Sequence, residues 1–280
     1  MKVVSNIEAL NHELGEVRKS GLSIGLVPTM GALHTGHKSL VEKSVAENDF
    51  TVVSVFVNPT QFNNTTDLEK YPRNLQRDAD LLETVGCNLV FAPEAKDVYS
   101  EKEMTNRFEF DFEGLDKVME GRFRPGHFNG VVQIVSKLFT LVGPDRAYFG
   151  EKDFQQLAII HLMVRKMGFK LQIVDCPIVR ETTGLALSSR NERLSRDQLK
   201  IAEQISHILT QSRHFAGKIE PKTLEEWVQV EVNAFEGLEV EYFEIVNINT
   251  LQPIKSWKEP SVGCIAVYCG EVRLIDNIKY

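Results

Sequence analysis

Two histidines three residues apart are the strongest chemical signal in the sequence. His34 and His37 lie in the segment PTMGALHTGH (residues 28–37), between an apolar run and a stretch with helical periodicity. We expect a strand-to-helix turn there, which directs backbone N–H groups and a positive helix end at a ligand. Gly31 and Gly36 would allow close approach to a phosphate, and both imidazoles could donate to phosphoryl oxygens. Surface histidines or a metal pair are the alternatives, although no Cys, Asp or Glu stands nearby at zinc-ligand spacing.

Polar side chains also follow the next predicted strands. Asn58 and Gln61 come just after the β-rich run FTVVSVFV, and their amides can both donate to and accept from hydroxyl and carboxylate groups. An ordinary turn punctuated by Asn-Pro is the alternative. Lys152 stands between a predicted strand and a predicted helix, where a lysine offers a mobile positive charge to a phosphate. A solvated lysine would fit the same spacing.

A third candidate is the string Ser188-Ser189-Arg190. Two hydroxyls and a guanidinium form a cradle for phosphate oxygens, and the arginine can bind them with two parallel hydrogen bonds. The alternative is a polar turn between domains.

The roles of two further groups of charged residues stay open. Arg122, Arg124 and His127 surround a Pro-Gly pair, and they could attract a carboxylate, shape a turn or form a dimer contact. Asp78 and Asp80 are candidate Mg²⁺ ligands, with Asp78 the better match, although a solvated helical face is the favoured interpretation.

These strings together resemble one known family. HTGH (residues 34–37) is similar to the HxGH signature of the nucleotidyltransferase superfamily that includes class I aminoacyl-tRNA synthetases. The longer string around it resembles the pantothenate synthetase (pantoate–β-alanine ligase) family. The other matching strings are FVNPTQF (56–62), GRFRPGHF (121–128), GEKDFQQ (150–156), LSSRN (187–191) and, near the C-terminus, RLIDN (273–277).

The resemblance implies an ATP-dependent ligase that forms an amide bond. It would condense (R)-pantoate with β-alanine to pantothenate, AMP and pyrophosphate, through a pantoyl-adenylate intermediate. ATP as substrate, Mg²⁺ and a homodimer are implied as well. Two alternatives stay open: another HxGH nucleotidyltransferase with a phosphate acceptor, and a nucleotide-binding module without activity. The amide side chains argue against the first, and the complete set of histidines and cations argues against the second.

The resemblance also implies the roles of individual residues. Gln61, Gln156 and Asn58 would bind substrate, with Gln61 on pantoate and bordering the β-alanine site, while Asp78 is a weak candidate for the metal. The implied catalytic residues are His34, His37, Lys152 and Arg190. The implied ATP-binding residues are Met30, Gly31, Ala32, Leu33, His34, Thr35, Gly36, His37, Gly150, Glu151, Lys152, Asp153, Val179, Leu187, Ser188, Ser189 and Arg190.

The elements that must position these residues alternate between helix and strand as far as about residue 176. Such alternation predicts an α/β fold with a Rossmann-like, mainly parallel sheet and helices on both faces. One of the expected strands covers residues 107–112, where charge and Phe alternate. Two helices and three strands follow, which predicts a smaller α+β unit. We therefore expect a nucleotide- and pantoate-binding domain over residues 1–176 and a C-terminal lid domain over residues 177–280.

Composition limits the class of protein. The 280 residues are 42% hydrophobic and 25% charged, which excludes a disordered chain and a collagen-like fibre. A net charge of −7 provides no basic field for nucleic acid. The four cysteines fit neither a metal motif nor a disulfide framework, so we expect reduced, packed thiols. Without a signal core or an apolar run of ~20 residues, no membrane association and a cytoplasmic location are expected.

Overall fold

The computed structural model describes residues 1–63, 65–105 and 108–280, and contacts between Cα atoms divide the chain into two compact units. The N-terminal unit comprises Met1–Gly114, Phe123–Glu151 and Gln156–Cys176. The C-terminal unit comprises Leu115–Arg122, Lys152–Gln155 and Pro177–Tyr280. The main division lies between Cys176 and Pro177. Two short segments from earlier in the chain also belong to the second unit. The nucleotide- and pantoate-binding domain over residues 1–176 and the lid domain over residues 177–280 stay predictions.

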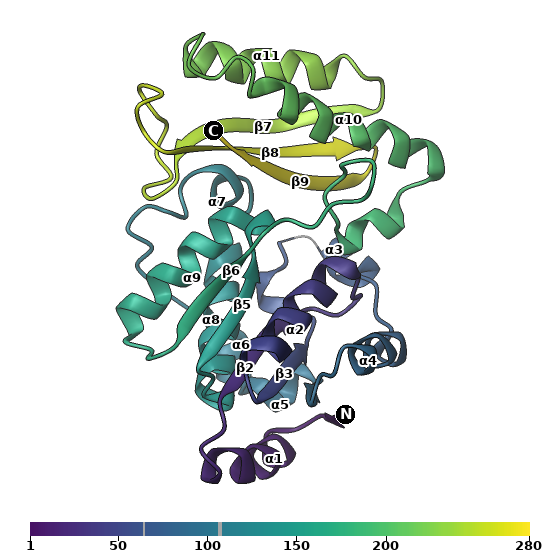
Figure 1. Cartoon of the computed structure of the whole chain (residues 1–280), viewed down its shortest axis with the longest axis vertical. Coiled ribbons are helices and arrows are strands. Elements are labelled where there is room, and N and C mark those ends of the chain that lie inside the picture. Colours follow the sequence, from purple (N-terminus) through teal and green to yellow (C-terminus); the bar gives the residue numbers. More distant parts are fainter. Residues whose placement is uncertain (64, 106–107) are drawn as a thin grey trace. The chain divides into compact units, whose positions relative to one another are not determined.

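The N-terminal unit is built on a six-stranded parallel sheet (Figure 1), which confirms the predicted α/β class. Its strand order is β1-β4-β3-β2-β5-β6. The strands are β1 (Lys2–Val4), β2 (Ile24–Thr29), β3 (Phe50–Val55), β4 (Leu89–Phe91), β5 (Arg146–Gly150) and β6 (Gln172–Cys176). The short edge strand β1 is missed from sequence, because three residues are too few to show a period.

Helices cover both faces of this sheet (Figure 1). Val27 of β2 and Val53 of β3 pack with Leu40 and Val41 of α2 in one buried cluster, while α8 packs against β2 from the other face. The longer helices are α1 (Ile7–Lys19), α2 (Thr35–Glu47), α4 (Leu75–Thr84), α8 (His127–Val142) and α9 (Phe154–Met167). The shorter ones are η1 (Pro59–Gln61), α3 (Thr65–Lys70), α5 (Ala95–Val98), α6 (Glu101–Thr105) and η2 (Glu151–Asp153).

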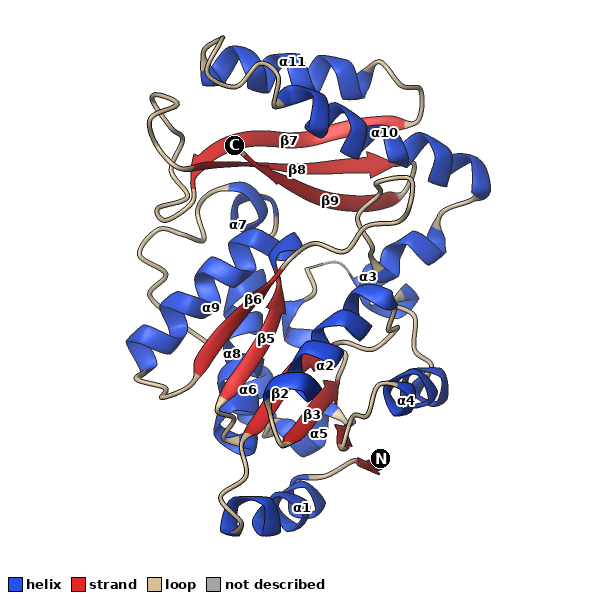
Figure 2. Cartoon of the chain, viewed as in Figure 1, coloured by secondary structure: helices blue, strands red, loops and turns tan. Residues whose placement is uncertain are grey.

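The C-terminal unit has a three-stranded antiparallel sheet, β7 (Leu238–Asn247), β8 (Ser261–Cys269) and β9 (Val272–Lys279) (Figure 2). Helices α10 (Arg196–Ser212) and α11 (Pro221–Asn233) bury one of its faces in a cluster that includes Leu209, Val228 and Val267. The unit also contains η3 (Ser189–Arg193) and all but the last residue of α7 (Met119–Phe123).

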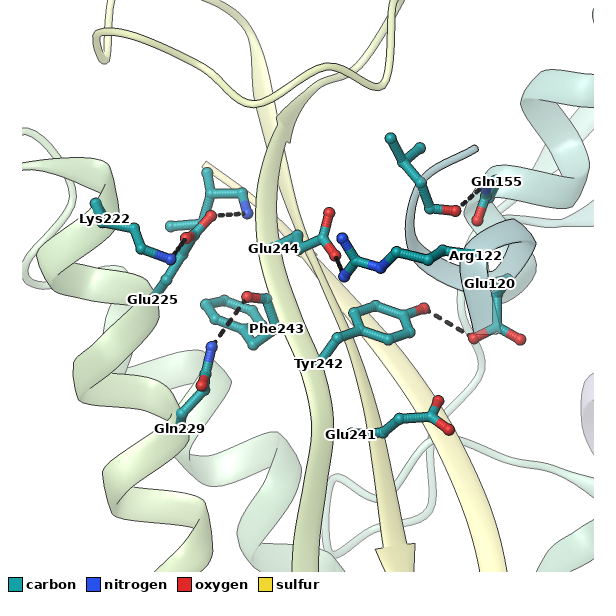
Figure 3. Close-up of polar contacts among 12 residues, drawn as sticks. Glu120, Arg122, Gln155, Lys222, Glu225, Gln229, Glu241, Tyr242, Phe243 and Glu244 are labelled. Carbon is teal, nitrogen blue, oxygen red and sulfur yellow. Dashed lines mark hydrogen bonds and ion pairs between the residues drawn. The ribbon is translucent and has the colours of Figure 1, made fainter. Parts of the chain in front are cut away.

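The two early segments attach to the opposite side of β7 from α11, as Figure 3 shows. Tyr242 of β7 donates a hydrogen bond to Glu120 (2.8 Å), and Arg122 forms an ion pair with Glu244. The amide of Gln155 donates to the main-chain oxygens of Leu115 (2.6 Å) and Val118 (2.8 Å), which joins the two segments. These long-range polar contacts explain why sequence periodicity could not assign the segments to their unit.

The strand predicted over residues 107–112 is wrong for the part that is described. Residues 108–112 form no strand, and residue 107 lies outside the described residues. The alternation instead reflects side-chain packing, since Phe110 and Phe112 make an edge-to-face pair and Asp111 pairs with Lys166. Within the described ranges, no helix is both long and apolar enough to cross a bilayer.

Gly25 provides a test of how tightly β2 and α2 approach each other. A Cβ on Gly25 would lie 2.2 Å from Ser44 Oγ and 2.6 Å from Asn48 Nδ2. We expect Gly25→Ala to lower the free energy of unfolding by about 1–3 kcal/mol, the usual cost of overpacking. Denaturant unfolding measures the change. The control is Gly15→Ala in α1, where an added Cβ meets nothing within 4 Å and should stabilise by about 0.5–1 kcal/mol.

Candidate active site

The loops that follow β2, β3 and β5 meet at the carboxyl edge of the parallel sheet. The chain runs outward from β2 through β3 to β4 on one side, and β5 and β6 lie on the other side of β2. The order therefore reverses between β2 and β5, and ligands of open α/β sheets bind at such a switch point. We call the residues here the switch-point cluster: residues 30–37 after β2, residues 58–61 after β3, and Gly150 and Glu151 after β5.

The turn after β2 has an unusual backbone that a buried carboxylate holds in place. Gly31 and Ala32 both have positive φ angles, 79° and 50°, and the second is unfavourable for a residue with a side chain. The two oxygens of Asp78 accept hydrogen bonds from the backbone N–H groups of Ala32 (3.0 Å) and Leu33 (2.7 Å). Asp78 is 1% exposed, so these contacts are shielded from water. They fix the turn that leads into α2.

The two histidines cap α2 and thereby orient each other. The backbone N–H of Gly36 donates to Nδ1 of His34 (3.1 Å), and the N–H of His34 donates to Nδ1 of His37 (3.4 Å). Their ring centroids are 4.1 Å apart. Because each Nδ1 accepts a hydrogen bond, a neutral ring carries its proton on Nε2. The cap therefore places the ring proton of each neutral imidazole on Nε2, beside the helix N-terminus.

Asn58 is buried and uses its amide on neighbouring protein groups. Its Nδ2 donates to Gln61 Oε1 (3.2 Å) and to the Gly130 main-chain oxygen (3.0 Å). Its Oδ1 accepts from the hydroxyls of Tyr99 (2.9 Å) and Thr60 (3.1 Å). Burial raises the pKa of Tyr99, so that hydroxyl stays protonated and able to donate. The structure gives Asn58 a positioning role, and its contact with substrate stays a prediction.

Gln61 is held on two sides and keeps a weakly bonded amide. Its main-chain oxygen lies 2.7 Å from Nδ1 of buried His127, and its Nε2 donates to Sδ of Met30 (2.8 Å). Helix α8 approaches this loop closely, because a Cβ on Gly130 would lie 2.4 Å from the Thr60 oxygen. A thioether is a poor acceptor, so a ligand oxygen could replace it.

The basic residues near Pro125 do not act as one cluster. His127 supports the Gln61 loop, whereas Arg122 belongs to the C-terminal unit and pairs with Glu244. His127 of the GRFRPGHF motif therefore has a structural explanation, which sequence reasoning missed because the contact joins residues more than sixty positions apart in the chain.

The predicted phosphate-binding residues divide between the units. Gly150, Glu151 and half-buried Gln156 belong to the N-terminal unit, while the cationic segments, residues 152–153 and 188–190, belong to the C-terminal unit. The side chain of Lys152 is 19% exposed, and its Nζ lies 3.2 Å from Asp153. Glu151–Asp153 forms η2, and α9 begins at the next residue, Phe154.

The second cationic segment follows a narrow hairpin. The N–H of Leu187 donates to the Val179 oxygen (3.1 Å), which brings these two predicted residues together. Ser188 then caps η3, since its Oγ accepts from the N–H of Arg190 (3.2 Å). Ser189 is buried and Arg190 half-buried in η3. The hydroxyl and guanidinium groups predicted to form a cradle are therefore held in one turn.

The structure offers no preformed metal cage among the residues that it describes. These residues include no group of three or more His, Cys, Asp or Glu arranged to hold an ion. Asp78 directs its two oxygens at backbone N–H groups, which is a structural task, so its role as a Mg²⁺ ligand gains no support here. The cysteines are free and buried, as predicted, and burial raises the pKa of Cys87 and of Cys176 to about 11.

Comparison with known proteins decides the family. A family model described as pantoate-beta-alanine ligase matches residues 2–279. The chain belongs to the pantoate–β-alanine ligase family. Pantothenate synthetases of Bacteroides thetaiotaomicron and Porphyromonas gingivalis are 58% and 53% identical to this ligase, each alignment covering 100% of this chain and 99% of the relative.

Solved structures agree with this assignment. The ligase matches the pantothenate synthetase of Thermus thermophilus with a TM-score of 0.90 and 41% identity, over 100% of this chain and 99% of that one. It matches a pantoate-beta-alanine ligase of Francisella tularensis, complexed with beta-gamma ATP and beta-alanine, with a TM-score of 0.85 and 36% identity, over 100% and 97% of the chains. The ligase catalyses ATP-dependent formation of pantothenate from pantoate and β-alanine.

Replacement of Asp78 distinguishes its structural task from metal binding. In Asp78→Asn an amide N–H₂ would face a backbone N–H, so we expect unfolding free energy to fall by about 1–3 kcal/mol. Activity should fall too, with an unchanged Mg²⁺ concentration at half-maximal rate. Exposed Asp80, which accepts from Gln76, provides the control Asp80→Asn, expected to be neutral. A marked rise in the Mg²⁺ requirement of Asp78→Asn alone would instead identify a metal ligand.

Proposed function

We propose that the chain makes pantothenate in two steps, through a pantoyl-adenylate intermediate. A carboxylate oxygen of pantoate attacks the α-phosphorus of ATP, and the bond from that phosphorus to the bridging oxygen of pyrophosphate breaks. The amine of β-alanine then attacks the acyl carbon, loses a proton and displaces AMP. Adenylation is needed because a carboxylate oxygen is a poor leaving group for attack by an amine.

The observation that carries this proposal is the pair of capped histidines at the switch point. Their Nδ1 atoms accept hydrogen bonds from backbone N–H groups, so a neutral His34 or His37 carries its proton on Nε2, beside the positive end of α2. Donors that are fixed before reaction stabilise charge as it develops on phosphoryl oxygens, without reorganising at that moment. Met30, Gly31, Ala32, Leu33, Thr35 and Gly36 are proposed to line the nucleotide along the same turn.

The cations of the C-terminal unit complete the proposed chemistry. We assign Lys152, Ser188, Ser189 and Arg190 to the ATP phosphates, where an arginine can make two hydrogen bonds and a lysine supplies a point charge. The proposed remaining nucleotide contacts are Gly150, Glu151, Asp153, Val179 and Leu187. Residues 177–280 would serve as the lid that excludes water from the hydrolysable intermediate.

Pantoate is assigned to amides of the N-terminal unit. Gln61 donates to a thioether in the structure, and a hydroxyl or carboxylate of pantoate is a stronger acceptor for that N–H. Gln156 is proposed as the second amide. Asn58 fixes the orientation of Gln61 through its own amide, and this support is its best-founded contribution.

Mg²⁺ is proposed to arrive with ATP. Mg²⁺ usually keeps several waters and binds through phosphates with one or two carboxylates, so it needs no protein cage. That requirement fits the described residues, which form no such cage. A homodimer and a cytoplasmic location are further proposals, and they rest on the family resemblance and on composition.

Pyrophosphate release tests the two-step route. With ATP, Mg²⁺ and (R)-pantoate but no β-alanine, we expect about one equivalent per active site, followed by continuous turnover once β-alanine is added. A quenched-flow assay of radiolabelled pyrophosphate measures both phases. Release that requires β-alanine from the start would contradict a stable adenylate and favour a concerted reaction.

Replacement of Lys152 tests the cationic segment. Lys152→Ala removes a charge proposed to stabilise the transition state, so single-turnover adenylation should slow by roughly 10²–10³-fold. The control is Lys258→Ala, an exposed lysine in the same unit, expected to leave the rate unchanged. A loss below about threefold in Lys152→Ala would remove this residue from the mechanism.

A further inference from the structure

The last strand carries three polar side chains that each hold a different distant segment. Arg273, Asp276 and Asn277 of β9 all lie in the string RLIDN, to which the proposed chemistry assigns no task. Arg273 forms two hydrogen bonds with Glu120, of 2.9 and 2.6 Å, and so secures the segment around α7. Asp276 and Asn277 are 5% and 3% exposed. Asn277 contacts the first cationic segment, and Asp276 contacts Arg180 in the hairpin that leads to the second.

Asn277 contacts the residue that carries the proposed catalytic lysine. Its Nδ2 donates to the main-chain oxygen of Lys152 (3.0 Å). The backbone N–H of Asn277 donates to Oδ1 of Asp276 (2.7 Å), which orients the neighbouring carboxylate relative to the strand. A lysine side chain has four rotatable bonds, so the point where it leaves the backbone decides which positions its ammonium can reach.

Asp276 forms an ion pair with Arg180, in the hairpin that leads to residues 188–190. The guanidinium of Arg180 forms a two-pronged pair with the carboxylate, with N–O distances of 2.6 and 2.8 Å. The same group donates to the Gly184 oxygen (3.1 Å) and so spans the hairpin. Arg180 also pairs with Ala186 in an isolated antiparallel bridge, and Ser188 follows directly.

Adjacent residues of one strand therefore hold both proposed phosphate-binding segments, Asn277 directly and Asp276 through the Arg180 hairpin. We infer that Asp276 and Asn277 are positioning residues, which set the spacing between Lys152 and the Ser188–Arg190 turn for phosphate binding. This inference rests on the proposed roles of Lys152 and Arg190. Precise spacing matters because donors misplaced by about 1 Å lose much of their effect on rate.

Substitution of Asn277 tests the inference through a double-mutant cycle. Asn277→Ala removes one neutral hydrogen bond, so single-turnover pyrophosphate release should slow by about five- to tenfold. The KM for pantoate should change less than about twofold, since pantoate is assigned to amides of the other unit. In a Lys152→Ala background the further loss should vanish, whereas in an Arg190→Ala background it should persist, because the contact that Asn277→Ala removes is the one to the lysine segment.

Arg180→Lys applies the same test to the other cationic segment, residues 188–190. It retains the charge but loses the two-pronged geometry, so its effect should depend on Arg190 and be independent of Lys152. Asn249→Ala, at an exposed asparagine of the same unit, is the matched control and should change neither rate nor thermal midpoint. If Asn277→Ala fails to fold, Asn277→Asp keeps the shape while replacing the amide donor.

The outcomes separate this inference from the proposed function. Equal losses for Asn277→Ala in both backgrounds, or no loss at all, would overturn the positioning role while the single variants of Lys152 and Arg190 still establish the function. Unchanged adenylation in both single variants would instead overturn their assignment as phosphate ligands. A fall in thermal midpoint with an unchanged rate would reduce Asn277 to a structural residue.

Discussion

The contact between the Asp78 carboxylate and the turn after β2 supports the remainder of the switch-point cluster. Two N–H groups of consecutive residues point into the protein at this turn, and one of those residues, Ala32, has a backbone conformation that disfavours side chains. A buried charge with two donors is stable there, because both oxygens are satisfied away from water. With the turn fixed, His34 reaches its capping position and the histidine pair acquires a defined tautomer. Chemistry at the helix N-terminus thus depends on an acidic residue in another helix.

In the C-terminal unit, polar side chains of a strand hold the turns that carry the cationic residues. Its cationic residues lie on a 3₁₀ turn and on a hairpin-linked turn, which are too short to be rigid by themselves. Side chains of β9 supply the missing rigidity through buried polar contacts. Burial pulls the pKa of Arg273 down, but its hydrogen bonds to Glu120 and Glu241 outweigh this effect and raise the pKa, so the guanidinium stays charged.

The sequence predicts the features that depend on local pattern. Alternating apolar runs reveal the parallel sheet, and glycine beside HxGH after a strand places the histidines at a helix start. The residue types at Lys152 and Arg190 indicate cations for phosphate. Contacts between residues far apart in the chain escape such reasoning. Asp78 was considered as a solvated residue or a weak metal candidate, because nothing local shows that two N–H groups face it. The positioning roles of Asn58, His127 and Asn277 were hidden for the same reason.

The attachment of residues 115–122 and 152–155 to the second unit limits how the chain can be divided. A polypeptide ending at Cys176 would contain Glu120 without Arg273, and would leave a carboxylate that is 8% exposed in the intact fold with no counter-ion. The complementary polypeptide would expose the side of β7 that Glu120 and Arg122 contact. Each piece would therefore lose buried polar contacts of the intact fold, among them the ion pair of Glu120 with Arg273 and the hydrogen bond that Tyr242 donates to Glu120. Neither piece is an autonomous module, so recombination between relatives at this boundary must exchange β9 together with the two early segments.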